Sequence, residues 1–364
     1  MQKNRIVDIL MSLLSNGDLF MAITHQAPNE YDRIPYRSKG FYRSSPVRMA
    51  TVGTLFGLES IQMKKARILE LGCSYGGNII PFAVNFPQSK VVGVDLSKVQ
   101  VDEGNRIIAE MGLKNIELKA MNMLDIDEKF GEFDFIICHG VFSWVPDIVK
   151  EHILKIVKTN LASNGLAYVS YNTYPGWKLN DILKDGMRFR VQSLLKNGET
   201  ISHEDYTRFG LGMVEFLEQY ADLDKGLKEK IQNLKNKDPY YLYHEYYEEF
   251  NDPIYFYQFA EKLKEKDLVH ISDSNLLRSV LINFQESHQA IQRECKGDHI
   301  AVEQYLDFLN EVQFRSSIIT HEKNRSQLIL QNALRKDLMN GVYVRGLFSL
   351  KSDSEENAND SGGG

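Results

Sequence analysis

The chain has 364 residues, of which 43% are hydrophobic and 25% are charged, as in an ordinary globular protein with two or three domains. Its formal net charge of −6 gives no basic footprint for nucleic acid, and its three cysteines, without a CxxC pair, exclude a disulfide framework or a zinc finger. No stretch has the run of apolar residues that a transmembrane helix needs, so we expect neither a nucleic-acid partner nor membrane insertion.

Residues 1–60 precede the predicted core and are expected to form an N-terminal helix and a lid segment. Ile6–Leu14 is apolar but is interrupted by Asp8, and no small-residue cleavage site follows, which favours an amphipathic surface helix over a signal peptide. An aromatic loop comes next, with Tyr31, Tyr36, Phe41 and Tyr42. Free thiols are typical of a reducing compartment, so we expect a cytoplasmic protein.

Residues 61–176 are predicted to form the core, because strand and helix signals alternate there in βαβ units. The predicted strands are residues 66–71, 90–94, 115–119, 133–139 and 165–171. The predicted helices are residues 78–85, 97–111 and 147–161, and Ser97 is the candidate N-cap of the second. This order predicts an α/β fold with a doubly wound, Rossmann-like parallel sheet, whose ligand lies at the carboxyl ends of the strands.

The most informative stretch is the turn after the first predicted strand, Glu70–Asn78. Its glycines are spaced G-x-x-x-G-G, which excludes the G-x-G-x-x-G of a dinucleotide site, and no Gly-Lys-Ser/Thr of a phosphate-binding loop follows. Glycine lets a ligand approach the backbone, and the helix that follows offers unpaired N–H groups. Glu70 either orders this turn, bonds an amino group of the ligand, or is only a strand-end charge. The candidate ligand-binding residues are Glu70, Gly72, Ser74, Gly76, Gly77 and Asn78.

Two further strand ends carry candidate nucleotide-binding residues. Asp95 ends an apolar strand at about the distance downstream at which nucleotide sites place a ribose-binding acid. After the third strand, Asn122 or Asp125 would bond the edge of an adenine while Met121 and Met123 pack on its face. The alternative is that the methionines only fill the core.

The ends of the fourth and fifth predicted strands carry the catalytic candidates His139, Trp144 and Tyr171. Aromatic residues at these ends, Tyr171 and Trp177 among them, would line a substrate channel, and His139 and Tyr171 are the candidates for a general base. The alternatives are a hydrogen-bonded core histidine and aromatic packing on the next helix. Histidines and cysteines show no metal-ligand spacing, so no metal site is predicted.

The remaining chain is predicted to be largely helical. Residues 177–275 are expected to form a helical cap and a segment that returns to the core, with a short strand at 268–272. Residues 276–350 are predicted to form a helical domain, and the acidic, Gly/Ser-rich residues 351–364 a disordered tail. The aromatic run at 240–247 is either a docking surface or core packed between the sheet and the cap.

These motifs resemble those of class I methyltransferases that use S-adenosylmethionine (SAM). The longer strings are similar to bacterial members that carry a methyltransferase regulatory domain, and they lie at residues 31–41, 70–81, 95–100, 139–146, 170–177, 244–246, 251–256 and 304–315. That group includes rickettsial protein-lysine methyltransferases that modify an outer-membrane protein. The resemblance implies that residues 276–350 are a domain of the regulatory type.

The resemblance implies SAM as the cofactor of this chain. It extends the cofactor-binding set, which already includes Asn122 and Met123, by Tyr36, Leu96, Gln100 and His139. It further implies methyl transfer to lysine side chains of a protein, with an outer-membrane protein before export as one candidate substrate. A SAM-dependent enzyme for small molecules and a SAM-binding scaffold without turnover stay open as alternatives.

Overall fold

The computed structural model describes residues 39–59, 61–196, 203–237, 239–248, 250–280 and 286–330. The predicted helix at Ile6–Leu14, the aromatic residues Tyr31 and Tyr36, and the predicted tail at 351–364 lie outside the described residues. Among the helices that are described, none combines the length and the apolar character needed to cross a bilayer.

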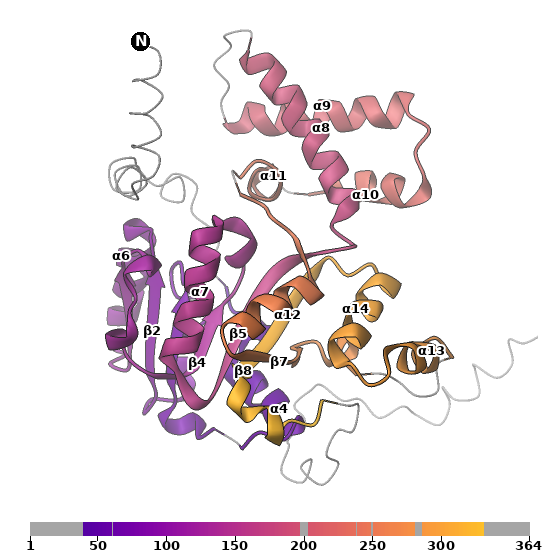
Figure 1. Cartoon of the computed structure of the whole chain (residues 1–364). Helices are drawn as coiled ribbons and strands as arrows, with labels where there is room; N and C mark the ends of the chain where they lie inside the picture. Colours follow the sequence, from indigo (N-terminus) through magenta and orange to yellow (C-terminus); the bar gives the residue numbers. More distant parts are fainter. Residues whose placement is uncertain are drawn as a thin grey trace, which may run out of the picture.

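The core is an eight-stranded sheet in the order β3-β2-β1-β4-β5-β8-β7, with β6 pairing β5 beside this path (Figure 1). The strands are β1 Arg67–Leu71, β2 Lys90–Asp95, β3 Ile116–Ala120, β4 Phe133–Cys138, β5 Leu161–Tyr174, β6 Ile254–Tyr255, β7 Leu268–Asp273 and β8 Phe314–His321. The first five strands pair in parallel, which confirms the predicted doubly wound sheet. The strand order reverses between β1 and β4, and in such sheets ligands bind at the carboxyl ends beside that point.

Helices cover both faces of the sheet, because successive strand residues point to opposite sides. Ile68 packs in a core with α4, α5 and α6, whereas its neighbour Leu69 packs in a core with α7 and α12 (Figure 1). These helices are α4 Pro46–Leu55, α5 Ile80–Asn85, α6 Lys98–Glu110, α7 Asp147–Asn160 and α12 Phe256–Glu265. Short 3-10 helices lie at η1 Tyr42–Ser44, η2 Met63–Lys65, η3 Met123–Asp125, η4 Glu128–Phe130, η5 Phe142–Trp144, η6 Leu276–Arg278 and η7 Glu322–Gln327.

The predicted core elements are present with ends that differ by a few residues. Ser97 caps α6 as predicted, since its side chain accepts a hydrogen bond from the backbone N–H of Gln100. The largest shift is in β5, which begins at Leu161 rather than at residue 165 because Leu161 already pairs with Phe133 of β4. The fourth strand ends at Cys138, so His139 is the first residue beyond it.

One expectation is wrong: residues 276–350 are not helical throughout. Among the described residues of this range, α13 Glu286–Cys295 and α14 His299–Leu309 are helices, but Phe314–His321 is strand β8. β8 runs antiparallel between β5 and β7, in the body of the sheet. Its apolar signal is only Ile318-Ile319, because the other buried positions hold polar side chains that are paired inside the fold, and so no strand pattern is visible.

The cap that follows β5 consists of α8 Lys178–Leu195, α9 His203–Tyr220, α10 Lys225–Lys235 and α11 Pro239–Tyr246 (Figure 1). These helices share a small core, which includes Met187, Val214, Ile231 and Leu242. In the aromatic run of α11, Tyr243 and Tyr246 are buried and Tyr241 is 42% exposed. This placement favours the interpretation of the run as core rather than as a docking surface.

Candidate functional site

The glycine turn after β1 adopts a conformation that its residue types require. Gly72 and Gly76 have φ angles of 74° and 78°, in the left-handed region that glycine tolerates without strain. The N–H groups of Gly72 and Cys73 donate to the carbonyl oxygen of Val94, which ties the turn to the end of β2. A Cβ on Gly72 would lie 2.5 Å from Cγ2 of Val141, so the segment after β4 packs directly on the turn.

Two glycines outside the motif let the turn sit this close to its neighbours. A Cβ on Gly93 in β2 would lie 2.7 Å from the Cys73 sulfur, and a Cβ on Gly104 in α6 would lie 2.6 Å from the Tyr75 carbonyl oxygen. The sequence interpretation did not single out either residue. The available signal was a glycine in the interior of a strand and of a helix, which often marks a close backbone approach.

Asp95 joins the ends of the first two strands. One of its carboxylate oxygens accepts the backbone N–H of Ser74 (2.7 Å), and the other accepts the N–H of Ser97 (2.9 Å). Gln100 is buried one turn into α6, and the side chain of Leu96 is 44% exposed. Asp95 therefore shapes the turn itself and, as a carboxylate with further lone pairs, is able to accept additional donors.

Glu70 and Ser74 present buried polar atoms without a partner among the described residues. Oε1 of Glu70 accepts from the side-chain amide of Asn78 (2.6 Å), but Oε2 of Glu70 and the hydroxyl oxygen of Ser74 have no hydrogen bond. Burial raises the pKa of Glu70 to about 8. Unpaired buried polar atoms are costly, so a polar ligand that bonds them would remove this cost.

Asn78 connects the turn to the segment that precedes the core. Its Oδ1 accepts the backbone N–H of Phe41 (2.9 Å) and the hydroxyl of Ser44 (3.2 Å). The Phe41 ring lies 3.8 Å, centroid to centroid, from the ring of His139. Phe41 thus links the glycine turn to the end of β4.

His139 follows β4 and is neutral. Its Nδ1 lies 3.1 Å from the hydroxyl oxygen of Tyr168, and burial lowers the pKa of His139 to about 4. The next residue, Gly140, donates its N–H to the hydroxyl oxygen of Ser170 (2.8 Å), so the backbone after β4 is fixed by β5. Trp144 ends η5 and is half-buried.

The end of β3 lies beside the same edge. Asn122 accepts the backbone N–H of Leu124 (3.0 Å) and caps η3, while Asp125 is exposed. Met123 is partly buried and packs against the core cluster that includes Leu71 and Val94. Asn122 and Met123 are therefore close to the strand ends, as predicted, and both keep some exposed surface.

The structure does not bring Tyr171 to this group. Tyr171 is fully buried, its ring lies 4.2 Å from that of Phe259 in α12, and its hydroxyl bonds Ser317 (3.1 Å). It packs in the core of α7 and α12, whereas Tyr168, three residues earlier, packs in the opposite core. Tyr36 lies outside the described residues.

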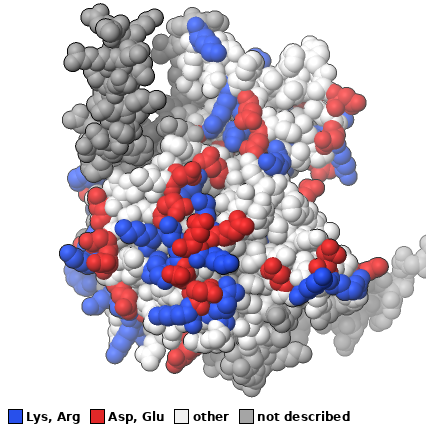
Figure 2. All heavy atoms as spheres, viewed as in Figure 1, with Lys and Arg blue, Asp and Glu red and all other residues white. Residues whose placement is uncertain are grey.

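Neither a patch of like charges on the face in Figure 2 nor a group of metal ligands marks this site among the described residues. In the face drawn in Figure 2, Lys and Arg side chains interleave with Asp and Glu over α7 and α12, where Glu151 pairs with Lys262 and Lys266. Within the described ranges, no group of three His, Cys, Asp or Glu side chains is arranged to hold a metal ion.

Comparison with known proteins identifies the family. Residues 68–165 match the family described as a methyltransferase domain, and residues 238–321 match the one described as a predicted methyltransferase regulatory domain. The uncharacterized protein RP789 of Rickettsia prowazekii is 38% identical over 298 residues, which are 80% of this chain and 53% of that protein. Uncharacterized protein RP028 of the same organism is 37% identical over 244 residues, which are 65% of this chain and 94% of that protein.

This chain belongs to the class I SAM-dependent methyltransferases that carry a regulatory domain. Among solved structures, PKMT2 from Rickettsia typhi in complex with AdoHcy is similar to this methyltransferase with a TM-score of 0.73 and 32% identity, covering 84% of this chain and 57% of that one. The chain spans about half the length of RP789 and of PKMT2.

SAM is the cofactor of this methyltransferase, and the residues of the turn fit it. The unpaired Oε2 of Glu70 and the unpaired hydroxyl of Ser74 suit a ligand with an amino group and a carboxylate. The regulatory match begins just before α11 and ends with β8, so it includes β8, which lies between β5 and the edge strand β7.

Proposed function

We propose that the protein transfers methyl groups from SAM to lysine side chains of a protein substrate. The observation that carries this proposal is the likeness to PKMT2, whose name denotes a protein-lysine methyltransferase, over 84% of this chain. The AdoHcy in complex with PKMT2 is the product that SAM becomes after it gives up its methyl group. A cytoplasmic location and an outer-membrane protein as substrate before export belong to the same proposal.

We assign SAM to the edge formed by the ends of β1, β2, β3 and β4. Glu70 would accept the amino group of SAM through Oε2, and the backbone around Gly72, Gly76 and Gly77 would cradle its amino-acid part, with Ser74 and Asn78 beside it. Asp95 would accept the ribose hydroxyls.

The adenine would lie between the ends of β2 and β3. Asn122 would bond its edge, and Met123 and the exposed side chain of Leu96 would pack on its face. Gln100 would support this part from α6. His139 would lie on the side where the methyl acceptor enters. Tyr36 belongs to the proposed set through its sequence motif alone.

Bound at this edge, SAM supplies a methyl group activated on a positively charged sulfur. The lysine of the substrate must react as a neutral amine. Removing the proton of a lysine with a reference pKa of 10.4 costs ~4.6 kcal/mol at pH 7. Aromatic side chains near the end of β4, such as Phe41, Trp144 and Phe314, lower this cost because an apolar environment disfavours the charged amine. Trp144 is the catalytic candidate of the sequence that fits this role.

The proposal is tested by incubating the protein with methyl-labelled SAM and fractionated bacterial lysate. Label in protein that survives precipitation and washing is the expected result. Label confined to small molecules would replace the proposal with a small-molecule methyltransferase. Binding of SAM in calorimetry without transfer to any fraction would indicate a scaffold without turnover.

A further inference from the structure

The segment that matches the regulatory-domain family, residues 238–321, contributes Ser316, which is linked to His139 through Tyr168. The register of the sheet pairs Cys138 of β4 with Val169 of β5, and Ser170 of β5 with Ser316 of β8. His139 and Ser316 therefore lie on either side of β5 at nearly the same level. The residue between them that faces both is Tyr168.

Two hydroxyl groups contact Nδ1 of His139: that of Tyr168 at 3.1 Å and that of Ser170 at 3.4 Å. The Tyr168 hydroxyl donates to the hydroxyl oxygen of Ser316 (3.1 Å), and burial raises the pKa of Tyr168 so that this proton is kept. With its proton directed at Ser316, the Tyr168 oxygen is left to accept a hydrogen bond from Nδ1 of His139 (3.1 Å). In this arrangement the neutral ring would carry its proton on Nδ1 and have Nε2 as its acceptor nitrogen. The more distant Ser170 oxygen already accepts the N–H of Gly140.

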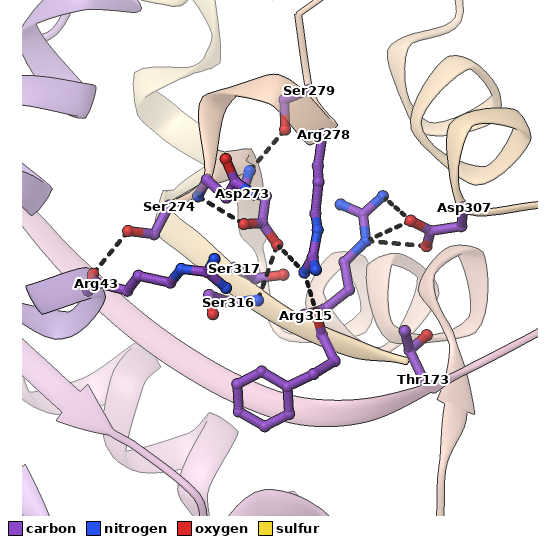
Figure 3. A network of polar contacts seen from close by, with 12 residues as sticks. Arg43, Thr173, Asp273, Ser274, Arg278, Ser279, Asp307, Arg315, Ser316 and Ser317 are labelled. Carbon is purple, nitrogen blue, oxygen red and sulfur yellow. Dashed lines mark hydrogen bonds and ion pairs between the residues drawn. The ribbon is translucent and has the colours of Figure 1, made fainter. Parts of the chain in front are cut away.

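Ser316 is itself held by a buried cluster of the regulatory match (Figure 3). Its backbone N–H donates to one carboxylate oxygen of Asp273 (2.9 Å), and the other oxygen accepts the N–H of Asn275 (2.7 Å). Arg278 donates to the carbonyl oxygen of Phe314 and lies 3.9 Å from the Asp273 carboxylate. Asp273 and Ser316 are fully buried, so the hydroxyl that Tyr168 needs has a fixed position.

The ring of His139 lies among aromatic side chains beside the candidate site. It packs at a tilt against the ring of Phe41, which is tied to the glycine turn through Asn78, and the ring of Phe314 approaches it edge-on at 6.2 Å. Within the described part of the chain, Nε2 of His139 makes no hydrogen bond.

We propose that Tyr168 and Ser316 are positioning residues that hold His139 in the Nδ1–H form, so that its Nε2 accepts a hydrogen bond from the amine that receives the methyl group. This inference rests on the proposed function, because it assumes an amine as methyl acceptor. Through Ser316, the segment 238–321 would then be part of the methyl-acceptor site.

The chemistry favours an acceptor nitrogen over a charged imidazole at this place. A neutral Nε2 bonds one N–H of the neutral amine and so directs the amine lone pair, without adding a positive charge beside a cationic donor. The amine nitrogen forms the new N–C bond as the C–S bond of SAM breaks, sulfur keeps the electron pair, and the positive charge passes to the methylated amine. His139 neither gains nor loses a proton in this step.

The sheet offers a matched control for Ser316. Ser317, the next residue of β8, bonds the hydroxyl of Tyr171 at the same distance of 3.1 Å on the opposite face of the sheet. Ser316→Ala and Ser317→Ala each remove one buried serine hydroxyl from a tyrosine–serine pair. Only the first of these pairs contacts His139.

The first test reads the His139 ring by NMR of protein labelled with ¹⁵N-histidine. The chain has 9 histidines, and the His139 signals are assigned by their loss in His139→Gln. We expect a protonated Nδ1 and an unprotonated Nε2 in the natural protein and in Ser317→Ala, and a mixture of both forms in Tyr168→Phe and Ser316→Ala. A protonated Nε2 in the natural protein, or an unchanged ring form in Tyr168→Phe, would overturn the inference.

The second test measures methyl transfer from labelled SAM to the lysate fraction that accepts the label. Tyr168→Phe should lower kcat about tenfold and leave the affinity for SAM within about twofold, since one hydrogen bond of the acceptor site is lost. The kcat of Ser316→Ala should lie between that of Tyr168→Phe and that of Ser317→Ala. Ser317→Ala should keep full activity. Equal losses of kcat in Ser316→Ala and Ser317→Ala would show that Tyr168 and Ser316 have a purely structural role. Label found only in small molecules would refute lysine as the methyl acceptor. The NMR measurement of the protonated nitrogen of His139 would still test the roles of Tyr168 and Ser316.

Discussion

At the scale of single residues, two carboxylates at adjacent strand ends have different environments. Both oxygens of Asp95 accept backbone N–H groups, and this carboxylate shapes the turn. Glu70 is buried with one oxygen unpaired, and its pKa is raised. We infer that Asp95 is fixed before the cofactor binds, whereas Glu70 obtains its missing partner from the cofactor.

Asp95→Ala removes two hydrogen bonds of the turn and the proposed ribose acceptor. We expect the Kd for SAM to rise by about 100-fold or more, because each lost charged hydrogen bond is worth roughly 1.5–3 kcal/mol. Isothermal titration calorimetry checks this. Asp102→Ala is the matched control, since Asp102 is an exposed aspartate on α6 paired with Lys98. An unchanged Kd in Asp95→Ala would refute the assignment of SAM to this edge.

Glu70→Gln should change how stability depends on pH. The pKa of Glu70 in the fold, about 8, lies above its ordinary value of 4.5, so the folded state holds a proton that the unfolded state releases. The contribution of Glu70 to stability is therefore present below pH 4.5 and is lost as pH rises to about 8. Without SAM, Glu70→Gln should gain in Tm relative to the natural protein between pH 5 and pH 8, as measured by thermal unfolding. A constant difference over that range would contradict this account of the environment of Glu70.

Tyr171→Phe separates the sequence prediction from the observed placement. The sequence predicts a catalytic role, but the structure buries Tyr171 under α12 with its hydroxyl on Ser317. We expect methyl transfer within about twofold of the natural protein and a loss of roughly 1 kcal/mol in stability from one buried hydrogen bond. A large fall in kcat with unchanged stability would restore the catalytic role.

The sequence placed the glycine turn, Asp95 and His139 at the ends of neighbouring strands, because strand signals are local, and their roles in binding stay predictions. It could not predict Tyr168 or Ser316, since their role comes from contacts between strands far apart in the chain. Gly93 and Gly104 were visible only as glycines inside regular elements, and their purpose depends on the packing of the turn.

At the scale of elements, β8 differs most from expectation. Arg315 in this strand is fully buried and pairs with Asp307 of α14 (Figure 3). It also pairs with Glu303 of α14, and its guanidinium lies 3.9 Å from the ring of Phe256. Although burial opposes it, His270 and Arg315 hold the pKa of Glu303 below its ordinary value. A strand with a buried arginine is recognisable only when its partners on other elements are known.

Arg315→Met should strongly destabilise the fold, because it leaves the carboxylates of Asp307 and Glu303 buried with fewer partners. The expected loss is about 3–5 kcal/mol in urea unfolding. Arg325→Ala is the matched control, since it removes a half-exposed arginine paired with Glu322 and should cost less than about 1 kcal/mol. Equal and small effects would show that the buried cluster does not hold α14 to the sheet.

At the scale of the whole molecule, one sheet joins the cofactor edge and the regulatory match. The carboxyl ends of β1, β2, β3 and β4 form the edge to which SAM is assigned, and β8 and β7 continue the sheet beyond β5 (Figure 1). The sequence predicted the parallel part because βαβ alternation is a local pattern. It predicted a short strand at 268–272 in a segment that returns to the core, where β7 lies, but it did not predict β8, since β8 depends on long-range pairing and on buried polar side chains.

The central claim is that this methyltransferase modifies lysine side chains of a protein. The most direct measurement is mass-spectrometric mapping of lysate proteins after incubation with methyl-labelled SAM, with Asp95→Ala as the inactive control. The account predicts labelled methyl groups on lysine Nζ atoms that appear with the natural protein and are absent with the control. Labelled methyl groups on another residue type, or on small molecules alone, would contradict it.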